Sequence, residues 1–183
     1  MKRTIGILIS FCLVMVVGCT QARYFTSSDP GYIPCYTPNE NCKLVSFKPG
    51  LEPAGFNGVK WETELSTLGE MKLYRKEPSH GGISFYVKPS DAYKLRNGKL
   101  VPIYYGFWRN KFYVGVVRTE QVSDWEALKE AVFEKYGAGA KPFSNQEEYL
   151  WIGKDVTMSL RYDAYAKTGL YYMRSHTMEK QMD

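Results

Sequence analysis

Two stretches of the chain alternate between apolar residues and other residues, and this period of two constrains the fold more than any other feature. In residues 83–88 every second side chain is Ile, Phe or Val, and residues 156–163 repeat the pattern with Val, Met, Leu and Tyr. Successive side chains of a β-strand point to opposite faces of its sheet, so each stretch is predicted to be a strand with one buried face. Half-buried strands are typical of antiparallel sheets.

Turn-forming dipeptides divide the remainder of this region into further strands. Turns are expected at Asn97-Gly98, Arg109-Asn110 and Gly153-Lys154, because Asn and Gly tolerate the positive φ that tight turns need. Strands are then predicted near residues 71–76, 83–88, 99–108, 111–119, 148–152, 156–163 and 169–174.

One segment between these strands is predicted to be a helix over residues 124–136. Ser123-Asp124-Trp125-Glu126 has the form of a capping box, and Gly137 stands where a helix commonly ends in a left-handed residue. Apolar side chains follow at helical spacing, namely Trp125, Leu128, Val132 and Tyr136. A short helical turn is expected over residues 63–68.

These elements predict an α+β fold in which an antiparallel sheet is packed by one main helix and a short helical turn. A single domain over residues 56–175 accounts for them, followed by a C-terminal tail at 176–183. A helix precedes a run of strands twice along the chain, and this order suggests two helix-then-strands repeats.

The N-terminus carries a targeting signal. Lys2 and Arg3 precede an apolar run, Ile5 to Val17, that is shorter than the roughly 20 residues of a membrane-spanning helix. The run ends in Val16-Val17-Gly18-Cys19, which resembles the lipobox of bacterial lipoproteins. The resemblance implies that residues 1–18 are a signal peptide, removed by a type II signal peptidase, and that Cys19 is lipidated. The alternatives are a single transmembrane anchor or an ordinary signal peptide.

A lipid on Cys19 would make the membrane a partner of this protein. The residue that follows is Thr20 and not Asp, which in lipoproteins of bacteria with two membranes implies the outer membrane, with the domain facing the periplasm. Residues 19–55 lack hydrophobic periodicity and are rich in proline, so they are expected to form a tether that lifts the domain off the membrane.

Two of the four cysteines remain once Cys12 in the signal peptide and Cys19 are set aside. In an oxidising compartment Cys35 and Cys42 are expected to form a disulfide that closes a small loop in the tether. Two free thiols, or a metal site that lacks its other two ligands, are the alternatives.

The segment Phe56-Asn57-Gly58-Val59-Lys60-Trp61 resembles a segment of uncharacterised bacterial lipoproteins. The order of a helix followed by a sheet is also distantly similar to the small outer-membrane assembly lipoproteins and to the β-lactamase inhibitor protein fold. This similarity concerns the fold alone, and it implies no functional residue, because the assembly lipoproteins have two leading helices and a shorter sheet.

Sequence motifs of catalysis are sparse. Ser79-His80-Gly81-Gly82 resembles the glycine-rich oxyanion loop of lipases, but the chain has no G-x-S-x-G elbow, and a turn explains the glycines. Glu147 and Glu148 are adjacent, so a strand would point them to opposite faces and spoil them as an acid-base pair. No metal-ligand spacing or cofactor motif is present. An envelope enzyme would need a site assembled from residues distant in sequence.

Charge argues against nucleic acid as a partner. The formal net charge is +5, with the positive and negative residues interspersed, whereas a phosphate-binding surface needs a clustered basic patch. Aromatic residues are more informative, because they make up 15% of the chain and gather at residues 104–113. Packing at the boundary of the core explains most tyrosines. The alternative is a recognition surface, since exposed Tyr and Trp are favoured at interfaces.

The turn at Arg109-Asn110 sets the expected register of the strands on either side. It pairs Phe107 with Phe112 on a face predicted to be core, which also holds Ile103, Tyr105, Val114 and Val116. The other face is expected to expose an aromatic strip that contacts an envelope protein or a glycan and consists of Tyr104, Trp108, Lys111 and Tyr113. The alternatives are that the two tyrosines merely cover Gly106 and Gly115, or that a helix buries the strip.

Overall fold

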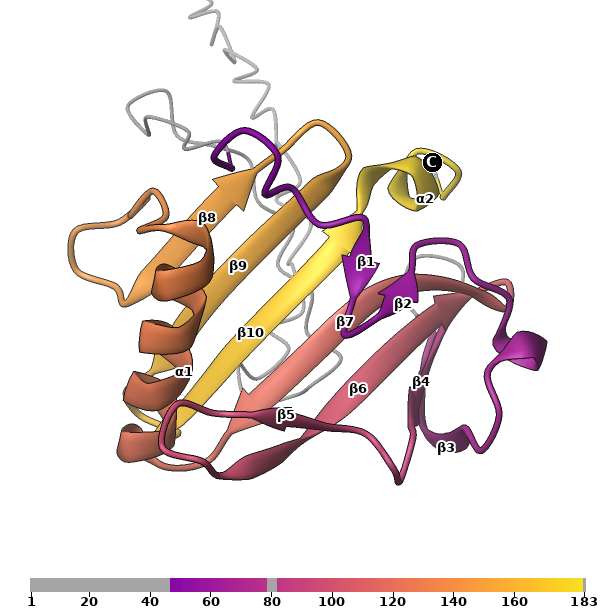
Figure 1. Ribbon diagram of the computed structural model, residues 1–183, viewed down its shortest axis with the longest axis horizontal. Coiled ribbons are helices and arrows are strands. Elements are labelled where there is room, and N and C mark those ends of the chain that lie inside the picture. The colour runs from indigo at the N-terminus through magenta and orange to yellow at the C-terminus, as the bar shows by residue number, and fades with distance from the viewer. Residues whose placement is uncertain (1–46, 79–81, 183) are drawn as a thin grey trace, which may run out of the picture.

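The computed structural model describes residues 47–78 and 82–182, and its centre is an eight-stranded antiparallel sheet (Figure 1). The main strands, in spatial order, are β3 (Lys72–Glu77), β4 (Ile83–Val87), β6 (Leu100–Trp108), β7 (Lys111–Thr119), β10 (Thr168–Ser175), β9 (Val156–Asp163) and β8 (Glu148–Ile152). The short β5 (Ala92–Lys94) pairs with the start of β6. The predicted α+β class, with an antiparallel sheet and one main helix, is confirmed.

One face of the sheet is covered by the helix α1 (Val122–Tyr136) and by a small hairpin of β1 (Gly55–Phe56) and β2 (Val59–Lys60) (Figure 1). The predicted strands and the predicted helix are all present, and the 3-10 helix η1 (Leu65–Thr67) forms the expected short turn. Sequence reasoning missed the β1–β2 hairpin, β5 and the short C-terminal helix α2 (His176–Glu179). Each of these elements is too short to show a period.

The apolar face of α1 faces the sheet as its spacing predicted. Trp125, Leu128, Val132 and Tyr136 are all buried and belong to the core on this side. Trp125 stacks on Tyr162 of β9, with ring centroids 5.4 Å apart. The helix therefore contributes one continuous stripe to the core.

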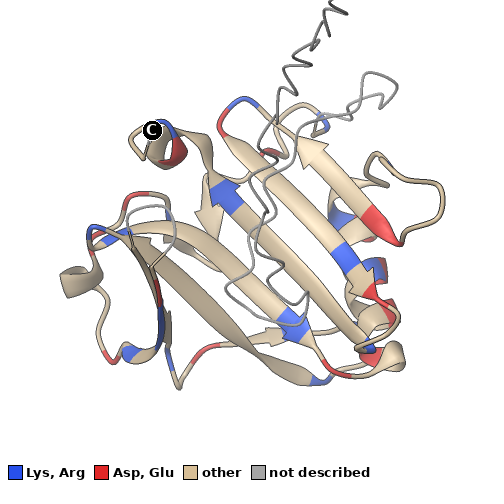
Figure 2. Ribbon diagram, turned by 180° about the vertical axis from the view of Figure 1, so that it is seen from behind, with Lys and Arg blue, Asp and Glu red and all other residues tan. Residues whose placement is uncertain are grey.

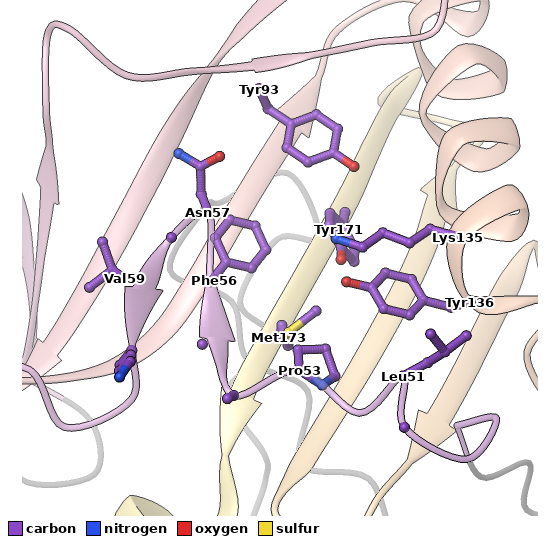
Figure 3. Close-up of a pocket in the computed structure, with 15 residues that line it drawn as sticks. Leu51, Pro53, Phe56, Asn57, Val59, Tyr93, Lys135, Tyr136, Tyr171 and Met173 are labelled. Atoms are coloured by element: carbon purple, nitrogen blue, oxygen red, sulfur yellow. The ribbon is translucent and has the colours of Figure 1, made fainter.

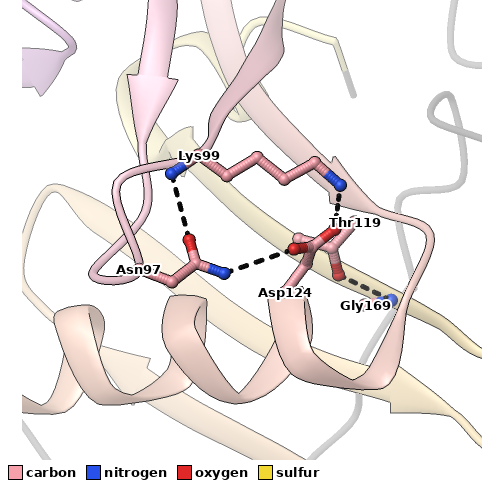
Figure 4. A network of polar contacts seen from close by, with 5 residues as sticks. All are labelled: Asn97, Lys99, Thr119, Asp124 and Gly169. Atoms are coloured by element: carbon pink, nitrogen blue, oxygen red, sulfur yellow. Dashed lines mark hydrogen bonds and ion pairs between the residues drawn. The ribbon is translucent and has the colours of Figure 1, made fainter.

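The expected capping box is wrong, because α1 begins one residue before Ser123, after Gln121, without a side-chain cap. Asp124 is instead buried in the first turn, where its carboxylate forms an ion pair with Lys99 and accepts a hydrogen bond from Asn97 (Figure 4). The Asn97-Gly98 turn is thereby tied to the start of the helix. Beside it, Thr119 accepts a hydrogen bond of 3.2 Å from the backbone N–H of Gly169 (Figure 4).

The β6–β7 hairpin has the predicted turn but a different register. Arg109 and Asn110 both have positive φ, and Phe107 pairs with Phe112 as expected. Beyond this pair a bulge adds one residue on β7, so that Gly106 pairs with Val114. Val114 and Val116 therefore lie on the face away from α1, and their expected placement with Phe112 is wrong.

Both ends of the described chain depart from the expected domain bounds. Phe47 is buried against Tyr136, and Glu52 accepts hydrogen bonds from the backbone N–H groups of Asp155 and Val156. Residues 47–55 thus belong to the domain and not to the tether. In the expected C-terminal tail, α2 buries Met178 against the second face of the sheet.

Several predicted residues lie outside the described part of the chain, namely Cys19, Cys35, Cys42 and His80. Within the described residues, none of the helices has both the length and the apolar composition to cross a membrane.

Candidate functional site: an aromatic pocket beside the helix

A cavity of about 490 Å³ opens on the helix side of the sheet (Figure 3). It lies between the β1–β2 hairpin with the segment that leads into it, the last turn of α1, and strands β5 and β10. Pockets that hold small molecules typically enclose roughly 300–1,000 Å³. The volume is therefore suitable for a ligand and too large for a packing defect.

The floor of this pocket depends on one glycine in the sheet. Gly115 pairs with Tyr105 on one side and with Met173 on the other. A Cβ at this position would collide with Phe56, whose ring fills the space that the missing side chain leaves. Phe56 then packs on Tyr171, with centroids 5.6 Å apart. The hairpin is thus held on the sheet by an aromatic ring over a bare backbone.

The hairpin that carries Phe56 is shaped by its turn. Asn57 and Gly58 both have positive φ, which is the signature of the type I′ turn favoured in two-residue hairpins. The Asn57 amide donates a hydrogen bond of 3.0 Å to the hydroxyl of Tyr105, which donates one of 2.7 Å to Asp91. Burial and the hydrogen bond to Asp91 raise the pKa of Tyr105. This chain fixes the side of the pocket next to β5.

The rim on the opposite side is also anchored. The indole of Trp61 donates a hydrogen bond of 3.0 Å to the carbonyl of Pro53 and stacks on Phe112. Glu52 is bound to the loop between β8 and β9 through the backbone N–H of Asp155, at 2.6 Å. The rim at residues 50–54 is therefore held in place before any ligand arrives.

Three tyrosine hydroxyls converge inside this pocket. Figure 3 shows Tyr93 and Tyr136 pointing their hydroxyls toward Tyr171. Burial, the neighbouring phenols and a hydrogen bond to Tyr136 raise the pKa of Tyr171 well above its ordinary value of 10. Burial and then Tyr136 raise the pKa of Tyr93. The phenols of Tyr93 and Tyr171 therefore stay protonated at neutral pH and are neutral hydrogen-bonding groups.

The charge of the lining is positive. Lys60 and Lys135 are the charged residues among the described residues that line the cavity. The ammonium of Lys135 lies 5.1 Å from the ring centroid of Tyr136, and Figure 3 shows its side chain reaching over the pocket. No ion pair joins Lys135 to a carboxylate of the described chain. Its charge is therefore directed at the cavity and the solvent.

The predicted aromatic strip lies elsewhere, on the face of the sheet away from α1. Figure 2 shows the sheet from this side. Trp108 and Tyr113 are each only 3% exposed. Tyr104 and Lys111 are half-buried, and Tyr104 packs on Tyr74 of the edge strand. The expectation that Trp108 and Tyr113 are exposed is therefore wrong, because both belong to a second core.

The alternative, that Tyr104 and Tyr113 cover Gly115 and Gly106, is also wrong. The bulge pairs Gly106 with Val114 and Gly115 with Tyr105. Side chains of Val114 and Phe85 fill the space above Gly106, and Phe56 fills the space above Gly115.

The His176 imidazole, outside the pocket, has structural partners. The hydroxyl of Thr157 lies 2.6 Å from Nε2 of His176, and Nδ1 of His176 lies 3.0 Å from the carbonyl of Lys154. This set anchors the start of α2 to the β8–β9 turn. Glu148 is buried, while Glu147 is half-buried. Among the described residues, no three His, Cys, Asp or Glu side chains are placed to hold a metal ion.

Sequence reasoning missed the pocket residues, although one signal for them is present. Asn57-Gly58 between two apolar residues is the strongest short-range sign of a hairpin. Tyr93, Lys135, Tyr136 and Tyr171 come from three separate elements, and only the folded chain brings them together. Comparisons with protein families, with curated proteins and with solved structures found no match to this chain.

Proposed function

We propose that the chain is a lipid-anchored protein of the bacterial envelope whose folded domain is a binding module. The lipobox-like segment that ends at Cys19 supports the anchor, and the absence of Asp after it supports an outer-membrane position facing the periplasm. An anchored module of this kind would act by holding a ligand or an envelope partner near the membrane.

The observation that carries the binding role is the pocket beside α1. Its rim is fixed by hydrogen bonds from Trp61 and to Glu52, so it is formed without a ligand. Its walls are aromatic and apolar, and a few polar tips from Tyr93, Tyr136 and Lys135 converge on it. A pre-formed apolar cavity with a small number of convergent polar groups is the usual form of a small-molecule site.

A blocked variant tests this role. Ala54 is exposed and lines the pocket, so Ala54→Trp is expected to place an indole across its mouth without disturbing the core. The probe is 2-naphthamide, a neutral bicyclic amide, titrated into isotopically labelled protein. We expect saturable shifts of backbone signals at residues 55–60 and 171–173 in the natural protein and their loss in Ala54→Trp.

The matched control is Ala138→Trp, which adds the same indole at an exposed position outside the pocket. It should bind the probe as the natural protein does. Binding that survives in Ala54→Trp, or shifts that map to another surface, would contradict the assignment of the pocket.

We also propose that the fold arose from two helix-then-strands repeats. The first run, β3-β4-β6-β7, and the second, β8-β9-β10, each follow a helix, and their last strands β7 and β10 pair antiparallel at the middle of the sheet. This arrangement supports a pseudo-two-fold relation between the halves. A chain cut at Glu120, between β7 and α1, should then reassemble from its two fragments, and failure of the fragments to associate would count against the repeats.

A further inference from the structure

We propose that the pocket takes a ligand with a flat apolar body and a single anionic group, and that Lys135 and Tyr136 bind the anion. This inference rests on the binding role proposed above and specifies its ligand. It follows from the charges, the hydrogen-bond donors and the apolar surfaces that meet in the cavity.

The charges favour an anion. The described residues that line the cavity include Lys60 and Lys135 but no Asp or Glu. A third lysine, Lys48, lies over the end of α1, since a Cβ on Gly137 would come within 3.7 Å of its ammonium. There Lys48 offsets the partial negative charge of the helix C-terminus. Lys135 also lies in the last turn of α1, but its ammonium reaches over the pocket and has no carboxylate partner among the described residues, so it is able to contact a ligand.

The hydrogen-bond donors point the same way. Tyr136 is 6% exposed, and its hydroxyl is directed into the cavity (Figure 3). The Tyr171 hydroxyl donates to Sδ of Met158 at 3.4 Å. A hydroxyl hydrogen turns toward the acceptor in reach, so the Tyr136 O–H is able to donate to a ligand oxygen in the cavity. Tyr93 directs a second hydroxyl toward the same point (Figure 3). Two phenol donors and an ammonium around one point match the acceptor oxygens of a carboxylate.

A neutral polyhydroxyl ligand fits these groups less well. Such a ligand brings many O–H donors, which need carboxylate or amide acceptors in the wall. The side-chain amide of Asn57 is the only amide among the described residues of the lining. Its N–H binds Tyr105, so its one carbonyl oxygen is the side-chain amide acceptor that the lining offers. Donors of the ligand would face donors of the protein, and unsatisfied polar groups are costly when buried.

The remaining surface is suited to a flat apolar body. Phe56 and Tyr171 form one aromatic wall, with Tyr93 6.0 Å from Tyr171 at an edge-to-face angle. Met173 and Pro53 close the opposite side (Figure 3). Ring faces and edges of this kind pack well against a planar ring system.

The test compares two probes of nearly equal shape. 2-Naphthoate carries a carboxylate where 2-naphthamide carries a neutral amide, and both are titrated into the protein by calorimetry at pH 7 and low salt. We expect the carboxylate to bind at least about tenfold more tightly than the amide, since hydrogen bonds to a charged group are roughly twice as strong as neutral ones.

Variants locate the effect. Lys135→Gln and Tyr136→Phe should each weaken the binding of 2-naphthoate several-fold and leave that of 2-naphthamide unchanged. The matched control is Lys129→Gln, which removes another α1 lysine that also lies over a ring, that of Trp125, outside the pocket. It should leave both affinities unchanged.

The outcomes separate the two proposals. Equal affinity for both probes, or no effect of either variant on 2-naphthoate, overturns the anionic ligand and leaves the binding role intact as long as Ala54→Trp still blocks binding. Failure of both probes to bind at millimolar concentration overturns both proposals. An equal loss of 2-naphthoate binding in Lys129→Gln would show general attraction to a basic surface and would also overturn the assignment to Lys135.

Discussion

Substitution of Gly115 by alanine tests how the β1–β2 hairpin is held on the sheet. Gly115 lies between Tyr105 and Met173 on the neighbouring strands, and Phe56 covers it. The φ of Gly115 is not positive, so its backbone conformation is open to alanine. The expected effect therefore comes from the ring above it and not from backbone strain.

The magnitude follows from the geometry. An ideal Cβ on Gly115 would lie 2.8 Å from the Cβ of Phe56, and closer still to two atoms of its ring. Carbon atoms pack at about 3.5–4.0 Å, so the ring has to retreat. Such overpacking costs about 1–3 kcal/mol, while alanine in a strand gains about 0.5–1 kcal/mol over glycine. The net loss should lie between about 0 and 2.5 kcal/mol, and a central value of about 1 kcal/mol lowers the Tm by about 2–8 °C.

A double-mutant cycle, measured by urea unfolding, decides whether the loss of stability comes from the Phe56 ring or from the backbone at Gly115. Phe56→Ala should cost about 3–5 kcal/mol by itself. In that background Gly115→Ala should cost nothing or stabilise, because the ring that it would strike is gone. Gly69→Ala is the matched control, since a Cβ there meets no heavy atom within 4 Å. A Gly115→Ala penalty that persists without Phe56 would refute the argument that the ring fills the glycine gap.

Three further predictions concern the anchor, the core and a buried acid. Cys19→Ala should lose palmitate labelling and membrane attachment, because two or three acyl chains hold a protein on a bilayer where one does so only marginally. Equal palmitate labelling of Cys19→Ala and the natural protein would refute the lipoprotein proposal. Trp125→Ala should cost about 3–5 kcal/mol of unfolding free energy, since Trp125 is buried against Tyr162, and an unchanged Tm would refute this. Burial raises the pKa of Glu148 above 4.5, partly offset by Arg161, so the folded state holds this proton more tightly than the unfolded chain. Stability from Glu148 is therefore lost as pH rises above about 4.5, and the stability of Glu148→Gln relative to the natural protein should grow between pH 4 and pH 7 in urea unfolding. A stability difference between Glu148→Gln and the natural protein that does not change with pH would contradict the raised pKa of Glu148.

The sequence predicts most of the sheet because its strands carry their own signals. The alternation at residues 156–163 puts Met158 and Leu160 into the core, and β9 follows it. The helix was equally accessible, since its stripe from Trp125 to Tyr136 is long enough to show a period. Local patterns of this kind depend on residues close together in the chain, so no tertiary knowledge is needed to interpret them.

The predicted start of the helix was wrong because a residue of its first turn, Asp124, has a partner elsewhere in the fold. Ser123 and Glu126 have the spacing of a capping box, but Asp124 forms an ion pair with Lys99 in the turn between β5 and β6, and the helix starts earlier. An ion pair between residues so far apart in sequence is invisible to a local pattern. The same holds for the pocket, whose tyrosines lie on β5, on α1 and on β10.

The bulge in β7 allows the sheet to support the pocket, because it places Gly115 on the side of the sheet that faces α1. With unbroken alternation from Phe112, Val114 and Val116 would face α1, and Gly115 would lie on the opposite face. The extra residue at Tyr113 reverses this order, so that the two valines join the second core and Gly115 opens toward the helix side. Phe56 can approach the backbone there, whereas a valine would hold it away. The hairpin that carries Phe56 is one wall of the cavity, so the proposed binding site depends on a single inserted residue in a strand that does not itself line it.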